Sequence, residues 1–128
     1  MKTGIILFGH GSTVASANEA VQAVAQKFAH DGGYDEVEVA FLDCAPPTLA
    51  GAVASLVARG VTRIVVIPYF LTLGIHPQRD LPRIVTGLEG IHQGVEIEVT
   101  PPLDGHPALV EILLDRARAS LPERNAAV

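Results

Sequence analysis

The chain has 128 residues, of which 48% are apolar and 18% charged, and its formal net charge at pH 7 is −5. These figures fit one folded domain with a core of its own and exclude a disordered chain. The acidic balance argues against nucleic acid as a partner, and the single cysteine excludes an internal disulfide or a cysteine-rich metal site.

Four segments rich in β-branched residues alternate with four segments whose apolar residues recur every three or four positions. The strand-like segments are 3–8, 36–42, 62–70 and 94–100. The helical segments carry apolar faces made of Val14, Ala17, Val21, Val24 and Phe28; Leu49, Val53, Leu56 and Val57; Leu81, Ile84, Val85 and Leu88; and Val110, Leu113, Leu114, Ala117 and Leu121. The order along the chain is therefore β-α-β-α-β-α-β-α.

Residues near the predicted helix ends support this division. Ser16 and Glu19 have the spacing of a capping box, and Asp80 suits an N-cap position. Gly60 stands where the second helix should stop, and Pro107 suits the first position of the fourth helix.

The pattern predicts an α/β fold with a single four-stranded parallel sheet. Segments 3–8 and 62–70 are almost continuously apolar, as expected of parallel strands with helices on both faces. Right-handed crossovers favour the flavodoxin-like order 2-1-3-4. We expect one domain, with a core of residues 1–121 and a tail of 122–128. No membrane-length apolar run or signal-peptide layout is visible, so we expect a cytoplasmic protein with no membrane partner.

Two histidines lie where a sheet of this order binds ligands. Strand order reverses between the first and third strands, and ligands bind beyond their carboxyl ends. His10 follows the first strand between Gly9 and Gly11, and His76 lies in the predicted loop after the third strand. Two neutral imidazoles at an open crevice can hold Co²⁺, Fe²⁺, Ni²⁺ or Zn²⁺. Either histidine alone would be an ordinary loop residue, so their pairing by topology is what favours a metal site.

Three other polar residues near this crevice have two interpretations each. The carboxylate of Asp43, at the end of the second strand, is either a metal ligand or proton acceptor, or the cap of the following helix. Arg79 and Arg83 are either a positive patch for an acidic ligand or a solvated helix face. Cys44 is interpreted as a small buried apolar residue, and His106 as a residue at the start of the fourth helix.

Four segments in order carry a resemblance to a known family: LFGHGS with His10, VEVAFLD ending at Asp43, PYFLTLGIHPQRDLP with His76 and Asp80, and PLDGHPAL. Over nearly its whole length the chain resembles the small sirohydrochlorin cobaltochelatases of the class II chelatases. The resemblance implies insertion of a divalent metal, with Co²⁺ ahead of Fe²⁺ or Ni²⁺, into sirohydrochlorin or a related tetrapyrrole in cobalamin or sirohaem synthesis. It implies no organic cofactor, since the metal is itself a substrate.

The resemblance also implies roles for individual residues. His10 and His76 match the family histidines that bind metal and act on the pyrrole nitrogens, and Asp43 stands where the family usually has the longer glutamate. Longer chelatases contain two similar halves around the site, so this half-length chain is expected to form a homodimer. Four further residues are expected at the substrate: Ser12, Arg79, Asp80 and His106.

Two alternatives come from other classes of protein. A non-catalytic carrier of metal or tetrapyrrole would use the same histidine pocket and would release no metallated product. A phosphatase with a histidine nucleophile also has a histidine after its first strand, but the arginine that normally precedes it is replaced here by Gly9. Metal binding and proton uptake both need neutral imidazole. Chelatase activity should therefore fall when the pH drops below the ordinary imidazole pKa of about 6.5.

Overall fold

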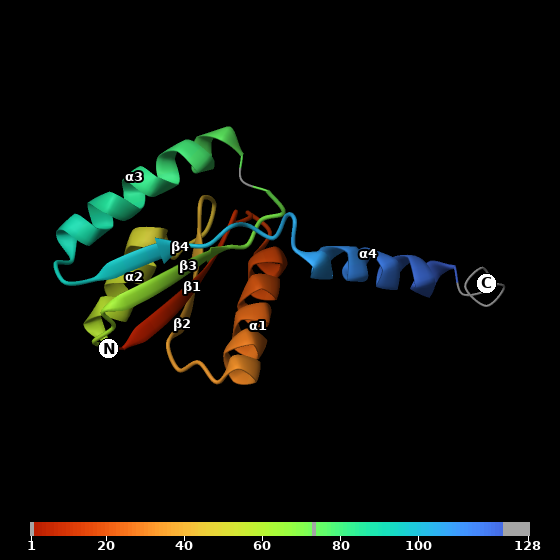
Figure 1. Ribbon diagram of the computed structural model, residues 1–128, viewed down its shortest axis with the longest axis horizontal. Coiled ribbons are helices and arrows are strands. Elements are labelled where there is room, and N and C mark those ends of the chain that lie inside the picture. Colours follow the sequence, from red (N-terminus) through yellow and green to blue (C-terminus); the bar gives the residue numbers. More distant parts are fainter. Residues whose placement is uncertain (1, 73, 122–128) are drawn as a thin grey trace.

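The computed structural model describes residues 2–72 and 74–121, without the side chains of residues 75–78. It is a parallel sheet flanked by helices (Figure 1). None of the helices in these residues is long and apolar enough to cross a bilayer. The elements are β1 (Thr3–Gly9), α1 (Ala15–Gly32), β2 (Val37–Phe41), α2 (Leu49–Ala58), β3 (Arg63–Pro68), α3 (Ile75–Ile91), β4 (Glu96–Val99) and α4 (Pro107–Ser120).

The sheet confirms the predicted strand order. Its strands run β2-β1-β3-β4, and all neighbouring pairs are parallel. At the end of β1, Gly9 pairs with Phe41 of β2, and Phe8 pairs with Pro68 of β3. The carboxyl ends of these three strands therefore lie together, on both sides of the point where the strand order reverses.

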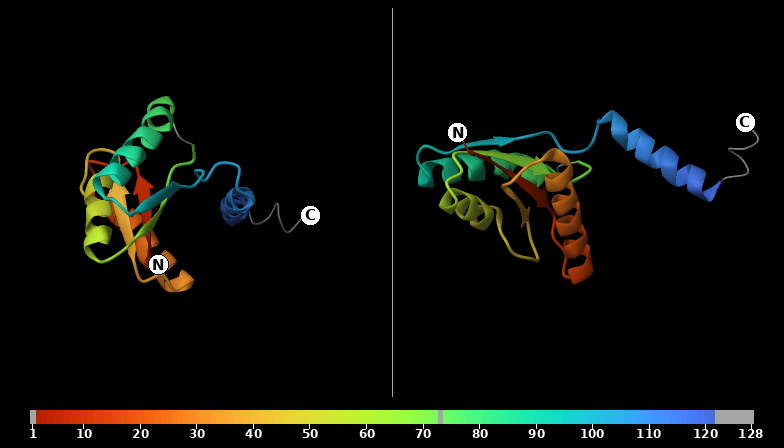
Figure 2. Two further views of the ribbon diagram at one scale, coloured as in Figure 1. Left: turned by 60° about the vertical axis from the view of Figure 1, so that its left-hand side comes forward. Right: turned by 90° about the horizontal axis from the view of Figure 1, so that it is seen from below.

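The two faces of the sheet are covered unequally (Figure 2). Helices α2 and α3 pack on one face over a cluster of sixteen buried residues that includes Ile64 and Val66. Helix α1 packs on the other face, where the described residues form a buried cluster of only Ile5, Leu7 and Ala25. Strand β3 is central in the sheet, yet its residues on the α1 side are only half-buried.

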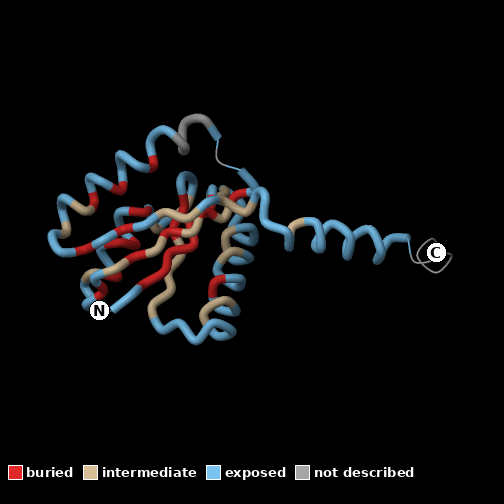
Figure 3. The backbone as a smooth tube through the Cα atoms, in the orientation of Figure 1, coloured by how far each residue is buried: buried red, intermediate tan, exposed pale blue. Residues whose placement is uncertain are grey.

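Helix α4 projects away from the sheet in every view (Figures 1 and 2). Figure 3 shows it exposed along nearly its whole length, and none of its residues is buried. Leu113 is 61% exposed and Val110 57%. The helix and its first residue, Pro107, are confirmed, but its predicted apolar face is open to solvent in the single chain.

Two of the predicted helix starts are wrong. Helix α1 begins at Ala15, so Ser16 lies inside it and forms no capping box. Its start is secured upstream, where the Asn18 side chain accepts from the Ser12 N–H (2.9 Å) and donates to the Ser12 carbonyl (2.8 Å). Helix α3 begins after Gly74, so Asp80 lies in its second turn and is not an N-cap residue.

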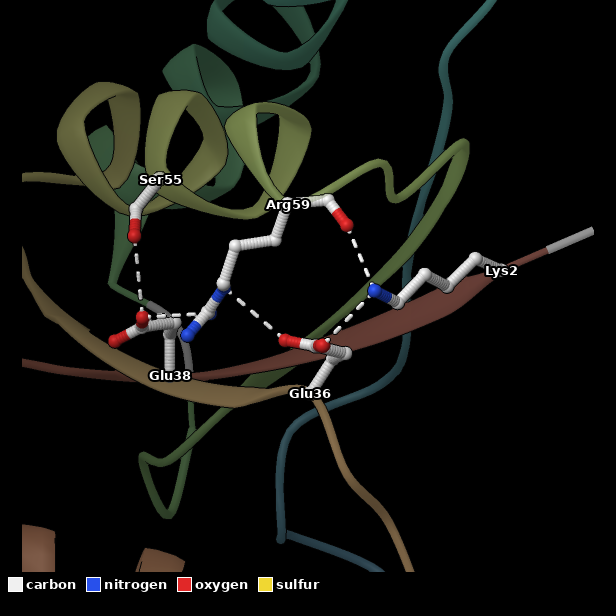
Figure 4. A network of polar contacts seen from close by, with 5 residues as sticks. All are labelled: Lys2, Glu36, Glu38, Ser55 and Arg59. Carbon is white, nitrogen blue, oxygen red and sulfur yellow. Dashed lines mark hydrogen bonds and ion pairs between the residues drawn. The ribbon is translucent and has the colours of Figure 1, made fainter.

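An ion-pair network closes the amino-terminal edge of the sheet (Figure 4). Arg59, which ends α2, forms an ion pair from Nε to Glu36 (3.1 Å) and donates from Nη2 to Glu38 (2.7 Å). Lys2 contacts the Glu36 carboxylate (3.1 Å) and donates to the Arg59 carbonyl (2.7 Å). Ser55 donates to Glu38 (3.2 Å). These contacts tie the end of α2 to the start of β1 and to β2.

Candidate functional site

His10 is the first residue beyond β1, at the carboxyl edge of the sheet. The residue is exposed, whereas the six strand residues before it are buried. Its imidazole rests against the ring of Phe70, with the ring centroids 4.4 Å apart and the planes at 57°. Because Phe70 is only 5% exposed, it offers the imidazole a fixed apolar support. The histidine is thus supported on one side and accessible from solvent.

Backbone hydrogen bonds hold the loops after β1 and β2 against each other. Leu42 N donates to Gly9 O, and Asp43 N donates to His10 O, both at 2.9 Å. Gly11 has a φ of +86°, and a Cβ on it would lie 1.9 Å from the Asp43 carbonyl oxygen. Only glycine fits this close approach. The backbone of His10 and that of Asp43 are therefore directly joined.

The carboxylate of Asp43 does not cap α2. Its Oδ1 accepts a hydrogen bond from the N–H of Cys44 (2.8 Å), the next residue along the chain. The N-cap of α2 is Thr48, whose Oγ1 accepts from Gly51 N (3.1 Å). The helix-cap interpretation is therefore wrong, and the exposed carboxylate lies in the loop beside His10.

Cys44 forms a sharp turn in the same loop. Its φ is +68°, which is uncommon for a residue with a side chain, and the residue is exposed, so its predicted burial is wrong. A cavity of about 360 Å³ opens at this loop, and its lining includes Asp43, Cys44 and Thr48. The loop after β2 thus gives the carboxyl edge a hollow that Asp43 helps to line.

The loop between β4 and α4 reaches the same edge through the chain that continues β3. Leu103 N donates to Phe70 O (3.0 Å), and Asp104 N donates to Leu71 O (2.7 Å). These bonds hold the loop beside the backbone of Phe70, whose ring supports His10. Four loops therefore meet at the carboxyl edge, as parallel α/β sheets with a ligand site require.

His76 lies in the first turn of α3, and its predicted place in a loop is wrong. The helix starts earlier than expected because extended Gly74 serves as its N-cap residue, and a proline such as Pro77 is tolerated in a first turn. The side chain of His76 lies outside the described residues, so its pairing with His10 stays a prediction. Within the described residues, no three His, Cys, Asp or Glu side chains are grouped to hold a metal ion.

The remaining predicted residues spread along this edge. Ser12 Oγ accepts from Val14 N (3.0 Å), so this hydroxyl helps to start α1 just after His10. His106 is the N-cap of α4, as its sequence position indicated, and its Nδ1 accepts from Ala108 N (3.0 Å).

Both Arg79 and Asp80 are exposed on the first two turns of α3. No contact in the described part of the chain joins either of them to His10 or Asp43. Sequence reasoning missed two residues that shape the site, Phe70 and Asn18. An asparagine near a helix start is a capping signal, whereas the contact of Phe70 with His10 spans sixty positions and leaves no local pattern.

A parallel 2-1-3-4 sheet with an accessible histidine directly after its first strand is the arrangement that the class II chelatase resemblance implies. The model of the CbiX family matches residues 4–120, and the chain belongs to that family.

Known proteins align with this chain over nearly its whole length. A sirohydrochlorin cobaltochelatase from Methanopyrus kandleri is 31% identical, over 93% of this chain and 97% of that protein. The crystal structure of a CbiX protein of cobalamin (vitamin B12) biosynthesis from Marinobacter aquaeolei VT8 aligns with a TM-score of 0.82 and 29% identity, covering 94% of this chain and 98% of that one. SirB from Bacillus subtilis, solved with Fe³⁺, aligns with a TM-score of 0.85 and 25% identity over 94% of this chain but 48% of its own.

Proposed function

We propose that this CbiX-family chelatase inserts a divalent metal ion, Co²⁺ in the first place, into sirohydrochlorin on the path to cobalamin. Family membership and the cobaltochelatase relative support the reaction class. The observation that carries the proposal is His10, an accessible imidazole supported by a buried aromatic ring at the ligand-binding edge of the sheet. Fe²⁺ and Ni²⁺ are the alternative metals.

Insertion replaces two pyrrole N–H protons by one M²⁺ ion, so two protons leave and no electron is transferred. The reaction needs a ligand that holds the ion with open coordination positions, and a base that accepts protons. A neutral imidazole can serve in either role, which is why histidine suits both. The metal is a substrate here, and no organic cofactor takes part in this stoichiometry.

We assign the metal to His10 and His76 together. The support for His76 is its place in the first turn of α3, a helix that follows the strand next to β1. Asp43 is proposed as a proton acceptor that acts through water, because its Oδ1 already accepts the Cys44 N–H within its own loop. The side chain of Asp43 is also shorter than that of the glutamate which, by the resemblance, usually stands at this position in the family.

The carboxylates of sirohydrochlorin need positive charge, although the chain is acidic overall. The exposed Arg79 and the N-terminal end of α3 are proposed to supply it, since helix N-termini favour anions. Ser12, Asp80 and His106 are proposed as further substrate contacts. The cytoplasmic location expected from the sequence stays a prediction.

We propose that the working form is a homodimer. The supporting observation is length: the chain aligns with 48% of SirB, so two copies match one such protein. One domain offers a crevice open on one side, and a second copy would cover a flat macrocycle held there.

The test is to mix the purified chain with sirohydrochlorin and Co²⁺ and to follow the visible spectrum. We expect the spectrum of the metallated product to appear over many turnovers per protein chain. Formation of no more than one equivalent, still bound to protein, would contradict catalysis and support the carrier alternative.

A further inference from the structure

The loop that carries His10 is fastened by the side chain of Asn18, a half-buried residue near the start of α1. The Oδ1 atom of Asn18 accepts from the N–H of Ser12 (2.9 Å), and its Nδ2 donates to the carbonyl of Ser12 (2.8 Å). One amide side chain thus satisfies both backbone groups of a residue six positions earlier. The two bonds need an acceptor and a donor side by side, which an amide supplies and a carboxylate does not.

This contact does not act as a helix cap. The N-cap residue of α1 is Val14, whose side chain makes no capping hydrogen bond. A capping side chain accepts from the free N–H groups of the first helical turn, whereas the N–H bonded to Asn18 belongs to Ser12, ahead of the helix. The contact therefore fixes the course of the loop that leads from β1 into α1.

The helix that provides this anchor is itself packed on the strand that ends at the site. Ala25 of α1 is buried together with Ile5 and Leu7 of β1. His10 directly follows β1, and Ser12 is bonded to α1. Both ends of this short stretch of loop are therefore attached to the same packed unit.

Only Gly11 separates His10 from Ser12, so a movement of Ser12 reaches His10 through a single residue. The carbonyl of His10 accepts from the N–H of Asp43 (2.9 Å), and its ring lies against that of Phe70, with the centroids 4.4 Å apart. These contacts hold His10 from two other sides. The anchor at Ser12 completes the set, because it stops the loop from moving away from them.

We infer that Asn18 is a positioning residue for metal insertion. Through Ser12 it holds the backbone of His10, and with it the imidazole, in place. The inference rests on the proposed function, in which this imidazole binds the metal and accepts protons. Metal–ligand distances vary by only about 0.2 Å between well-formed sites, and misplacing a reacting group by about 1 Å can cost about 100-fold in rate. Release of the loop therefore slows insertion even while the protein stays folded.

The test replaces Asn18 by a side chain of the same shape that lacks the donor. Asn18→Asp keeps an acceptor for the Ser12 N–H, but it turns the bond to the Ser12 carbonyl into a repulsive contact between two oxygens. The matched control is Gln22→Glu, which makes the same amide-to-carboxylate change at an exposed residue one turn further along α1. Asn18→Ala removes both bonds without adding a charge and serves if Asn18→Asp does not fold.

The first measurement reads the position of the His10 ring without metal or substrate. The ring of Phe70 shifts the NMR signals of the His10 ring protons away from those of free histidine, because the two rings are in contact. His10→Ala identifies these signals among those of the five histidines. We expect the His10 signals to move toward the free values in Asn18→Asp and to stay at the wild-type values in Gln22→Glu. Unchanged His10 signals in Asn18→Asp would overturn the inference.

The second measurement is the rate of Co²⁺ insertion into sirohydrochlorin, at a temperature where circular dichroism shows every variant to be folded. We expect Asn18→Asp to be slower than wild type by about tenfold or more, and Gln22→Glu to stay within about twofold of it. An Asn18 with a merely structural role would lower the melting temperature and leave the rate of the folded protein unchanged, and that result would overturn the inference. If the wild type inserts no metal, the proposed function fails, whereas the NMR comparison still decides whether Asn18 positions His10.

Discussion

The two edges of the sheet use polar side chains in different ways. At the amino-terminal edge, Lys2, Glu36, Glu38 and Arg59 are paired with one another and tie α2 to the sheet (Figure 4). At the carboxyl edge, His10 rests on an apolar ring and stays accessible. Groups that are paired with each other stabilise the fold, whereas groups left open can exchange ions and protons with a substrate.

The largest expected effect is at His76, which shares α3 with a histidine at the opposite edge. We expect His76→Ala to lower the rate of Co²⁺ insertion by roughly 100-fold or more, since it removes a proposed metal ligand and base. His92, the C-cap residue of α3, is the matched control, and His92→Ala should keep most of the rate. Equal insertion rates for the two variants would show that His76 does not belong to the proposed site. The histidines at the two ends of α3 would then not differ in function.

An intermediate effect is expected at Asp43. Asp43→Asn keeps the shape of the side chain and an oxygen for the Cys44 N–H, but removes the charge and the basicity. If the carboxylate accepts a proton through water, insertion should slow by about tenfold, below the usual range of general-base effects, with little change in melting temperature. Steady-state rates and thermal unfolding of Asp43→Asn decide this, and an unchanged rate would leave Asp43 with a structural role in its loop.

The smallest effect is expected at the amino-terminal edge. Arg59→Ala should lower the free energy of unfolding by about 1 kcal/mol, because Arg59 joins two carboxylates but its side chain is 43% exposed and solvent-screened. Lys27→Ala, which breaks the exposed pair with Asp31, is the control and should cost less than about 0.5 kcal/mol. Denaturant unfolding measures both. If folded Arg59→Ala inserted metal more slowly, this would contradict the division into an amino-terminal edge that stabilises the fold and a carboxyl edge that acts on the substrate.

Much of the fold could be predicted because its signals are local. The runs of β-branched residues marked all four strands, and the handedness of crossovers selected the strand order. The position of His10 followed from the end of the first strand.

The features that were not predicted depend on contacts between residues far apart in the sequence, which no short sequence pattern reveals. Asp43 and Thr48 both suit an N-cap, and only the course of the loop makes Thr48 the cap of α2. Helical spacing revealed the apolar side of α4, but spacing does not tell that this side stays exposed in the single chain. The support that Phe70 gives to His10 likewise appears only when the strands are side by side.

The role of His10 in metal insertion is tested most directly by the rate at which His10→Ala inserts Co²⁺ into sirohydrochlorin. Thermal unfolding is measured on the same preparation. His10 is exposed and its ring makes one aromatic contact among the described residues, so its loss should shift the melting temperature by less than about 2 °C. We expect the rate to fall roughly 100-fold or more while the protein stays folded. A folded His10→Ala protein with near wild-type turnover would contradict it.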